Sequence, residues 1–368
     1  MHVVTVIGTR PEAIKLGPVV RELRARGFAC TVIHTGQHTD LVADPFALFD
    51  IQPDIVLDTM REGQPLAKLV ASLATSLTNA LKSIDDIDVV VVQGDTASTM
   101  VGALAAMNLG LPVAHVEAGL RTSDPYDPFP EEVNRMVVTM ATTHHFAPTD
   151  TAAANLRREG IPEADIAITG NTAVDAVKFV LEEFGSELEQ DRTDAGLSGL
   201  RYVAMTLHRR ESWGARMRET LAGVRDYMES DPDLHLVFPM HPNPTVRAAA
   251  ADMLSGTPRV RLVEPAGYRP FIALMQGAEL IVTDSGGIQE EAPSLGKHTL
   301  VLRESTERTE GISAGTATLV GVEREAVRDA IATALAAPPM PIVVNPFGDG
   351  HASERIVDVL QELYAQAL

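Results

Sequence analysis

Three acidic side chains stand where the sequence could place groups for acid–base chemistry. Asp95 and Glu117 lie at the carboxyl ends of two apolar runs, and Glu131 follows at the start of a helical pattern. Each has an ordinary structural explanation, because Asp favours helix N-caps and Glu favours first helical turns. Carboxylates that converge in one place raise at least one pKa, and this suits proton transfer. The three acids are therefore candidate catalytic groups.

Basic residues follow the first apolar run, which ends at Gly8. Arg10 precedes Pro11, a residue suited to the first turn of a helix, and Lys15 follows within that helical pattern. The N-terminus of a helix favours an anion. Both side chains are candidates for binding phosphate, although taken singly each is more typical of a solvated surface.

Histidines end two apolar runs in the second half of the chain. His208 is followed by Arg209 and Arg210, and His241 ends the next run. A single histidine is more often structural than catalytic, but a strand end would deliver His208 together with two arginines. Such a group could bind or protonate a departing phosphate.

The segment 283–291 reads TDSGGIQEE and joins an apolar run to a helical pattern. Gly286 and Gly287 allow a ligand to approach the backbone closely, and N–H groups from Ser285 onward could hold a diphosphate. Glu291 lies one turn further along and could bind a ribose diol. The segment indicates a nucleotide-sugar site without specifying the reaction.

The elements that position these residues alternate β-branched runs with helical patterns, which is typical of parallel sheets covered by helices. We expect strands at residues 2–8, 29–35, 88–94, 112–118, 144–148, 202–208, 235–241, 260–264, 280–285 and 298–303. We expect helices at residues 11–26, 65–82, 131–141, 215–229, 244–254, 270–277, 287–295, 323–337 and 353–368.

The chain is long enough for two domains. We expect α/β architecture, with Rossmann-like doubly wound parallel sheets at residues 1–170 and 171–352 and a terminal helix at 353–368. Ligands of such sheets bind beyond the carboxyl ends of the strands, near a topological switch point. Two such domains facing each other would form a cleft lined by the candidate residues.

Composition narrows the class of function. The chain has 368 residues, a formal net charge of −20 and one cysteine, Cys30. It should therefore repel nucleic acid and anionic membranes, and it can form no intrachain disulfide. It shows neither a signal-peptide pattern nor an apolar run that could span a membrane, so we expect a cytoplasmic protein. Walker A, GxGxxG after the first strand, HExxH and CxxC motifs are absent, which argues against P-loop, dinucleotide and zinc sites.

Nine motifs taken together resemble the non-hydrolysing UDP-N-acetylglucosamine 2-epimerases, from residue 3 to about residue 357. They are GTRPEAIKL, QGDTAST, HVEAGLRT, PFPEEVNR, GNTAVDA, HRRESWG, HPNP, TDSGGIQEEAPSLGK and NPFGDGHASERI. The resemblance implies two GT-B-like domains with the site between them, and a C-terminal helix that packs back on the first domain.

The resemblance also implies a reaction, the reversible epimerisation of UDP-GlcNAc to UDP-ManNAc at C2. In the family, C2–H is deprotonated and UDP leaves C1 by anti elimination. UDP then re-adds to the 2-acetamidoglucal after a proton reaches the other face of C2. No metal or nicotinamide cofactor is implied, and the expected partners are the two UDP-sugars, UDP and a second copy of the chain in a homodimer.

Positions that match the family carry expected roles. Asp95 and Glu117 would handle protons, and Glu131 would orient them or the sugar. Lys15 would support the acids, and His208 would stabilise the departing phosphate. The expected substrate-binding residues are Arg10 on the diphosphate, Arg135, Phe271 near the uracil, Ser285, Gly286 and Gly287 on phosphate, and Glu291 on the ribose.

Bacterial members often bind a second, activating UDP-GlcNAc beside the first. The matching positions are Gln37, His38, Arg209 and His241. The chain departs from that pattern at Asp40, where a longer polar residue is lost, and at Gly63, where some members have a basic residue. Substrate activation is therefore an open expectation.

Three other functions remain open. A hydrolysing epimerase would release UDP and free ManNAc, a glycosyltransferase would share the UDP site, and a catalytically silent sensor would bind without turnover. The three acids Asp95, Glu117 and Glu131 favour epimerisation, because a transferase does not need all three and a sensor is expected to have lost one.

Overall fold

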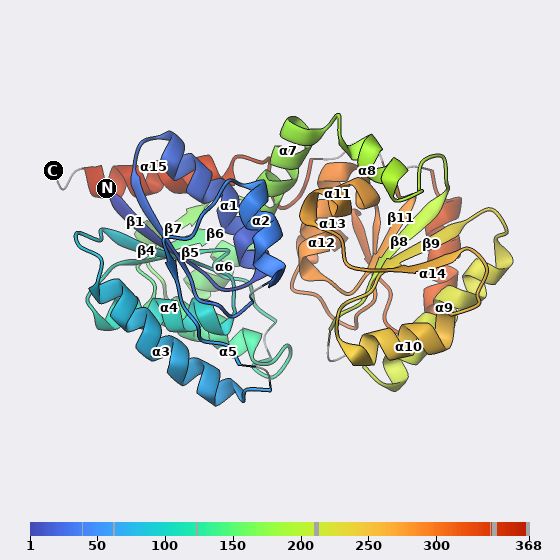
Figure 1. Ribbon diagram of the computed structural model, residues 1–368, viewed down its shortest axis with the longest axis horizontal. Coiled ribbons are helices and arrows are strands. Elements are labelled where there is room, and N and C mark those ends of the chain that lie inside the picture. Colours follow the sequence, from blue (N-terminus) through green and yellow to red (C-terminus); the bar gives the residue numbers. More distant parts are fainter. Residues whose placement is uncertain are drawn as a thin grey trace. The chain divides into compact units, whose positions relative to one another are not determined.

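The computed structural model describes residues 1–38, 40–61, 63–122, 124–209, 213–338, 340 and 344–365. The chain divides into two compact units (Figure 1). Unit 1 is Met1–Ala176 with Phe347–Leu368, and unit 2 is Val177–Pro346. The division falls within one helix, α7 (Thr172–Phe184), whereas the sequence placed the boundary before it. The sequence-based boundaries at 170 and 352 stay predictions.

Within the described residues, unit 1 is built on a seven-stranded parallel sheet of order β3-β2-β1-β4-β5-β6-β7. Its strands are β1 (His2–Ile7), β2 (Ala29–His34), β3 (Ile55–Val56), β4 (Val89–Gln93), β5 (Val113–Val116), β6 (His144–Ala147) and β7 (Ile166–Ile168). Its helices are α1 (Arg10–Ala25), α2 (Ala43–Leu48), α3 (Leu66–Lys82), α4 (Ala97–Asn108), α5 (Glu131–Ala141), α6 (Asp150–Arg158), the first part of α7, and α15 (Ala352–Ala365).

Helices cover both faces of the sheet in unit 1 (Figure 1). Val4 and Val6 of β1 pack with Val90 and Val92 of β4 against α3 and α4. On the opposite face α1 packs against α15, the C-terminal helix. Because strands buried on both faces need apolar residues at every position, β4 reads as an unbroken valine run.

The part of unit 2 that the structure describes contains a six-stranded parallel sheet of order β10-β9-β8-β11-β12-β13. Its strands are β8 (Tyr202–Thr206), β9 (His235–Pro239), β10 (Val260–Val263), β11 (Leu280–Thr283), β12 (Thr299–Val301) and β13 (Ala317–Leu319). Besides the end of α7, its helices are α8 (Leu188–Asp194), α9 (Ala215–Ser230), α10 (Pro244–Leu254), α11 (Tyr268–Gly277), α12 (Gly286–Glu291), α13 (Thr309–Ser313) and α14 (Arg324–Ala336). Short 3₁₀ helices lie at η1 (Asp40–Val42), η2 (Glu163–Asp165) and η4 (Ala292–Leu295).

Alternation along β8 divides the core of unit 2 between two faces. Val203 and Met205 point to the cluster shared with α9, α10 and α14, while Tyr202 and Ala204 belong to a second cluster with α11. The two doubly wound parallel sheets predicted from the sequence are thereby confirmed. In the described residues, no helix is long and apolar enough to cross a membrane.

The strand orders define one topological switch point in each sheet. The first lies between β1 and β4, and the second lies between β8 and β11, because the chain leaves a central strand on one side and returns on the other. The segments that follow these four strands carry most of the residues singled out from the sequence. We therefore expect a site beyond the carboxyl ends of β1, β4, β8 and β11.

Candidate functional site

A buried ion pair lies beyond β1 and β5 in unit 1. Lys15, in the second turn of α1, donates a 2.6 Å hydrogen bond to Oε2 of Glu117, and both side chains are buried. Gln93 at the end of β4 donates to the same oxygen. Glu117 has a positive φ of 67°, a conformation that is uncommon for a residue with a side chain. Such a residue is held by its surroundings, and here Lys15 and Gln93 supply the contacts that fix its carboxylate.

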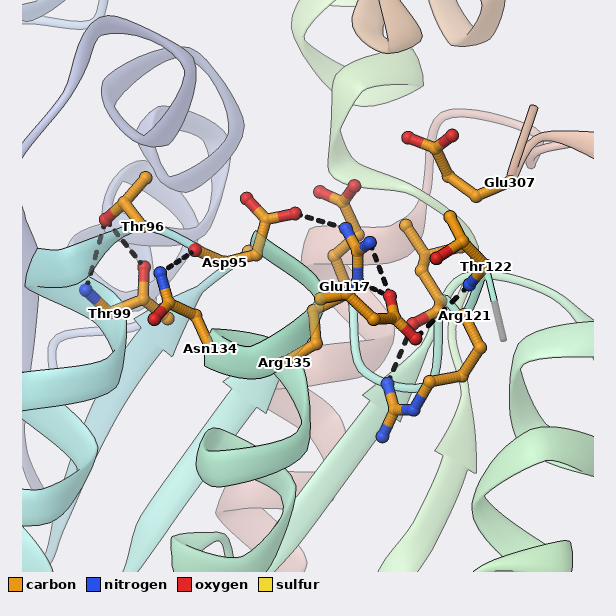
Figure 2. A network of polar contacts seen from close by, with 12 residues as sticks. Asp95, Thr96, Thr99, Glu117, Arg121, Thr122, Asn134, Arg135 and Glu307 are labelled. Atoms are coloured by element: carbon orange, nitrogen blue, oxygen red, sulfur yellow. Dashed lines mark hydrogen bonds and ion pairs between the residues drawn. The ribbon is translucent and has the colours of Figure 1, made fainter. Parts of the chain in front are cut away.

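Asp95 lies in the turn between β4 and α4 and is bound by α5 (Figure 2). Nη1 of Arg135 donates to its Oδ2 at 2.5 Å, and the Asn134 amide donates to its main-chain oxygen at 2.8 Å. Arg135 also contacts Glu132 through Nε at 2.8 Å and Nη2 at 2.6 Å. The Arg135 side chain is only 3% exposed, whereas that of Asp95 is 29% exposed. Asp95 therefore keeps a solvent-facing edge while its geometry is fixed from behind.

The two remaining predicted residues of the unit 1 group open helices. Arg10 is the first residue of α1 and Glu131 is the first residue of α5. The Arg10 main-chain N–H donates to Nδ1 of His38 at 3.4 Å. The structure thus gathers Arg10 and Lys15 on α1 with Asp95 and Glu117 after neighbouring strands, as the order of the sheet requires.

Glu12 is a residue of this group to which the sequence reasoning gave no role. Its carboxylate is buried and accepts hydrogen bonds from the main-chain N–H groups of Gly8 and Thr9 and from the Thr96 hydroxyl, with the Thr99 hydroxyl 3.2 Å away. Burial raises the pKa of Glu12 to about 7, although these hydrogen bonds oppose the rise. The signal in the sequence is Thr9-x-x-Glu12, a capping box that starts α1.

Gln37 and His38, predicted for a second site, lie after β2 in unit 1. The Gln37 amide oxygen accepts from the main chain of Ser98 at 3.1 Å and from its hydroxyl at 2.7 Å. The His38 carbonyl accepts from His34 at 2.9 Å. These contacts place the pair beside the first turns of α1 and α4. Thr39 and the Asp40 side chain, where the chain departs from the family pattern, lie outside the described residues.

In unit 2, His208 follows β8 and contacts Asp284 at the end of β11. Its ring Nδ1 lies 3.0 Å from Oδ1 of Asp284, and the main-chain N–H groups of His208 and Arg209 donate to the same carboxylate. Asp284 is fully buried; burial alone would raise its pKa, but His208 and these hydrogen bonds hold the pKa below its usual range. Asp284 therefore orients the His208 ring and leaves Nε2 for a ligand.

His241, predicted for the second site, lies in the loop between β9 and α10, and its ring neighbours that of His208. The ring centroids are 6.0 Å apart, and burial and the neighbouring His208 lower the pKa of His241. Arg210 and Glu211, which follow Arg209 in the sequence motif, lie outside the described residues.

Arg209 is held by a buried cluster of charged side chains centred on Glu307. Its Nε donates to the Asp284 carbonyl at 3.1 Å, and its Nη2 lies 3.4 Å from Glu307. Glu307 also pairs with Arg303 at 2.8 Å and with Arg308. Burial would raise the pKa of Glu307, but the three arginines hold it far below its ordinary value. The burial of Glu307 could not be predicted from the sequence, because an acid in a loop carries no periodic signal of burial.

The glycine-containing turn of unit 2 leads from β11 into α12, as predicted. Ser285 is the N-cap residue, and its N–H donates to the Thr283 hydroxyl at 3.0 Å. A methyl group added at Gly287 would meet open space, whereas one at Gly286 would press against the Arg308 guanidinium. The Gly287 surface is therefore free to be approached by a ligand.

Glu291 and Phe271 lie on elements that adjoin this turn. Glu291 ends α12 and is buried, and its Oε1 accepts from the Tyr268 hydroxyl at 3.0 Å. Phe271, also on α11, is partly buried against the cluster of Tyr202 and Leu274. The other predicted residues of unit 2 follow β8, β9 and β11, whereas Phe271 lies on α11, which follows β10. No group of three His, Cys, Asp or Glu suited to a metal ion occurs among the residues that the structure describes.

Comparison with known proteins decides the family. The sequence model of the family described as UDP-N-acetylglucosamine 2-epimerase matches residues 21–361. The chain belongs to this family. A relative from Ralstonia solanacearum, named probable UDP-N-acetylglucosamine 2-epimerase, is 42% identical over 99% of both chains.

Solved structures of the epimerase family agree with the fold described above. The UDP-GlcNAc 2-epimerase from Neisseria meningitidis bound to UDP-GlcNAc has a TM-score of 0.94 at 38% identity, covering 98% of this chain and 100% of that one. The Methanocaldococcus jannaschii UDP-GlcNAc 2-epimerase in complex with UDP-GlcNAc and UDP has a TM-score of 0.88 at 34% identity, with coverage of 98% and 100%. Both similarities span essentially the whole of this epimerase-family chain.

Proposed function

We propose that this chain is a non-hydrolysing UDP-N-acetylglucosamine 2-epimerase, which interconverts UDP-GlcNAc and UDP-ManNAc through 2-acetamidoglucal. The observation that carries the proposal is the pair of fixed carboxylates in unit 1, Asp95 bound by Arg135 and Glu117 bound by Lys15. Epimerisation at C2 needs proton transfer on two faces of one carbon, and two separately held carboxylates meet that need.

The elimination step begins with removal of the proton on C2 by a carboxylate. The C2–H electron pair forms the C1=C2 double bond, and the C1–O bond breaks with its electrons going to UDP. In the reverse addition, a proton reaches C2 from the opposite face while a UDP oxygen bonds to C1. Lys15 and Arg135 each hold one of these carboxylates through an ion pair, Glu117 at 2.6 Å and Asp95 at 2.5 Å, so each has a fixed position from which to exchange a proton with C2.

Unit 2 supplies the groups that bind UDP in this proposal. Ser285, Gly286 and Gly287 would hold phosphate through main-chain N–H groups, with His208 stabilising the leaving diphosphate. Glu291 would bind the ribose diol, held in place by the Tyr268 hydroxyl at 3.0 Å, and Phe271 would lie near the uracil. A chain with a net charge of −20 needs local hydrogen-bond donors such as these to bind a dianion.

The proposal extends to regulation and assembly. Gln37, His38, Arg209 and His241 would bind a second, activating UDP-GlcNAc, and the chain would act as a homodimer. The ring of His241 beside that of His208, at a centroid distance of 6.0 Å, supports a link between the two sites. Sigmoidal dependence of the rate on UDP-GlcNAc would support activation, and a hyperbolic dependence would contradict it.

The test of the reaction is a proton NMR time course of UDP-GlcNAc with the protein in deuterated buffer. We expect UDP-ManNAc with deuterium at C2 and no free ManNAc. Free ManNAc with UDP would indicate the hydrolysing reaction instead. An unchanged spectrum with tight binding of UDP-GlcNAc would contradict both forms of epimerisation.

A further inference from the structure

Three successive main-chain carbonyls around Asp95 each accept a hydrogen bond from a buried side chain. The Thr99 hydroxyl donates to the Gln93 oxygen at 2.6 Å, His115 Nε2 donates to the Gly94 oxygen at 2.8 Å, and the Asn134 amide donates to the Asp95 oxygen at 2.8 Å. Figure 2 shows the Asn134 side chain reaching the main chain of Asp95, with Thr99 next to it in this view.

The three donors come from three different elements. Thr99 lies in the first turn of α4, His115 lies on β5 and Asn134 lies on α5, with side chains that are 2%, 0% and 5% exposed respectively. The next carbonyl, that of Thr96, accepts from Met100 within α4 at 3.0 Å. Each carbonyl from the end of β4 to the start of α4 therefore accepts a hydrogen bond, so the turn cannot rotate a peptide group without breaking one of them.

His115 is a donor whose only side-chain hydrogen bond among the described residues is the one to the Gly94 carbonyl. Its ring is fully buried, and burial lowers its pKa to about 3, so the imidazole stays neutral near neutral pH. A neutral ring has one N–H, and the carbonyl of Gly94 requires that N–H on Nε2. Nδ1 is buried without a partner among the described residues, so the contact with Gly94 is the ring's hydrogen bond.

We propose that Thr99, His115 and Asn134 are positioning residues that hold the Gln93–Asp95 main chain, and through it the Asp95 carboxylate, in the orientation needed for proton transfer at C2. The inference rests on the proposed function, because it gives Asp95 a part in that reaction. None of the three donors contacts the Asp95 carboxylate itself; Arg135 does that, at 2.5 Å.

The expected signature separates positioning from folding. Displacing a base by a fraction of an ångström lowers the rate of the chemical step, while UDP binding in unit 2 is unaffected. Loss of the His115 donor should therefore lower kcat and the rate of deuterium uptake at C2 by about tenfold to 100-fold. The dissociation constant for UDP should not change.

The experiment compares three variants of the full chain. His115→Leu removes the donor, and His115→Gln places an amide N–H near the position of Nε2. His145→Leu is the matched control, because His145 is buried on the adjacent strand β6, directly opposite His115 in the register, and burial lowers its pKa also. We expect low kcat in His115→Leu, recovery in His115→Gln and near-normal kcat in His145→Leu.

Each outcome bears on one claim. Wild-type protein that fails to exchange C2–H would refute the proposed function. If the wild type exchanges C2–H, a normal kcat in His115→Leu would refute the positioning role. A kcat that falls equally in His145→Leu would refute it too. If His115→Leu does not fold, Asn134→Leu tests the same claim from α5, where we expect reduced kcat with unchanged UDP affinity; unchanged kcat there would overturn it. Amide hydrogen exchange at Asp95 and Thr96 should accelerate in the folded variants that lack a donor. Unchanged exchange would count against the positioning role.

Discussion

At the scale of single residues, two buried carboxylates of unit 1 differ in what compensates their charge. Glu117 accepts from the ammonium of Lys15 at 2.6 Å. Glu12 instead accepts hydrogen bonds from main-chain N–H groups and a threonine hydroxyl, which carry no full charge. Burial therefore raises the pKa of Glu12 to about 7. The start of α1 thus contains a carboxyl group that titrates near neutral pH.

Glu12 should make stability fall as the pH rises. Its pKa is about 7 in the folded chain against an ordinary 4.5, so the folded chain holds this proton more tightly than the unfolded chain does. The contribution is fully present below the unfolded value and is lost as the pH rises through the folded value, by roughly 3 kcal/mol. Glu12→Gln, which mimics the protonated form, should remove this dependence. Comparison of unfolding midpoints at about pH 5 and about pH 8 measures it; parallel pH profiles for the two proteins would contradict the assignment.

Removal of Lys15 should destabilise unit 1 strongly. Lys15→Met leaves the Glu117 carboxylate buried without its cation, which typically costs roughly 3–5 kcal/mol. The double variant Lys15→Met with Glu117→Gln should recover most of that loss, because no unpaired charge remains. Urea unfolding of both proteins measures the difference. Arg61→Met, at an exposed pair with Asp58, should change nothing measurable, and a similar loss there would show that burial is not the cause.

At the scale of elements, glycines can be kept either because a ligand approaches them or because the fold leaves no room for a side chain. Substitutions by alanine at the turn before α12 and on α9 distinguish these two reasons. A methyl group at Gly287 meets open space, so Gly287→Ala should leave stability unchanged or slightly raised while weakening UDP binding by about tenfold or more. Gly223→Ala on α9 should lower stability and leave UDP binding unchanged, because its methyl group would meet the Arg324 carbonyl. Calorimetric titration with UDP and thermal unfolding measure the two effects; normal UDP affinity in Gly287→Ala would exclude this turn from the phosphate site.

Elements with a long apolar period could be predicted from the sequence, and those without one could not. The strands missed were β3, β7 and β13, which have two or three residues each and lie at sheet edges. Such strands are defined by pairing with a neighbour and carry too few residues for alternation to show. Helix α4 was not singled out either, since ASTMVGALAAMN is small and apolar on nearly all sides and has no polar face.

Some residues of the candidate site could likewise be predicted from the sequence, and others could not. Motifs at strand ends predicted that Asp95 and Glu117 lie at the carboxyl edge of the first sheet and His208 at that of the second, and these positions are found; their roles stay predictions. Their supports, such as His115 and Asp284, could not be assigned from sequence. A buried polar residue that binds a main-chain group has the same local pattern as a core position, and its partner lies 21 residues away for His115 and 76 for Asp284.

At the scale of the whole molecule, unit 2 is continuous in the chain whereas unit 1 is closed by the C-terminal segment. Asp175 on α7 accepts from the main-chain N–H groups of Ala352 at 3.1 Å and Ser353 at 2.7 Å, which caps the start of α15. Ile356, Val357 and Leu360 of that helix are fully buried. Burial of each such side chain contributes roughly 1.5–3 kcal/mol, so α15 supplies a large share of the stability of unit 1.

This discontinuity predicts that the two units differ in their ability to fold alone. Residues 177–346 contain both core clusters of unit 2 and should fold and bind UDP, while residues 1–176 should remain unfolded because the face of α1 that α15 covers is exposed. Joining 347–368 to 1–176 through a short flexible linker should restore cooperative unfolding. Circular dichroism and UDP titration of the three fragments measure this. A folded 1–176 fragment would contradict the dependence on α15. A folded 177–346 fragment without UDP affinity would contradict the assignment of the UDP-binding groups to unit 2.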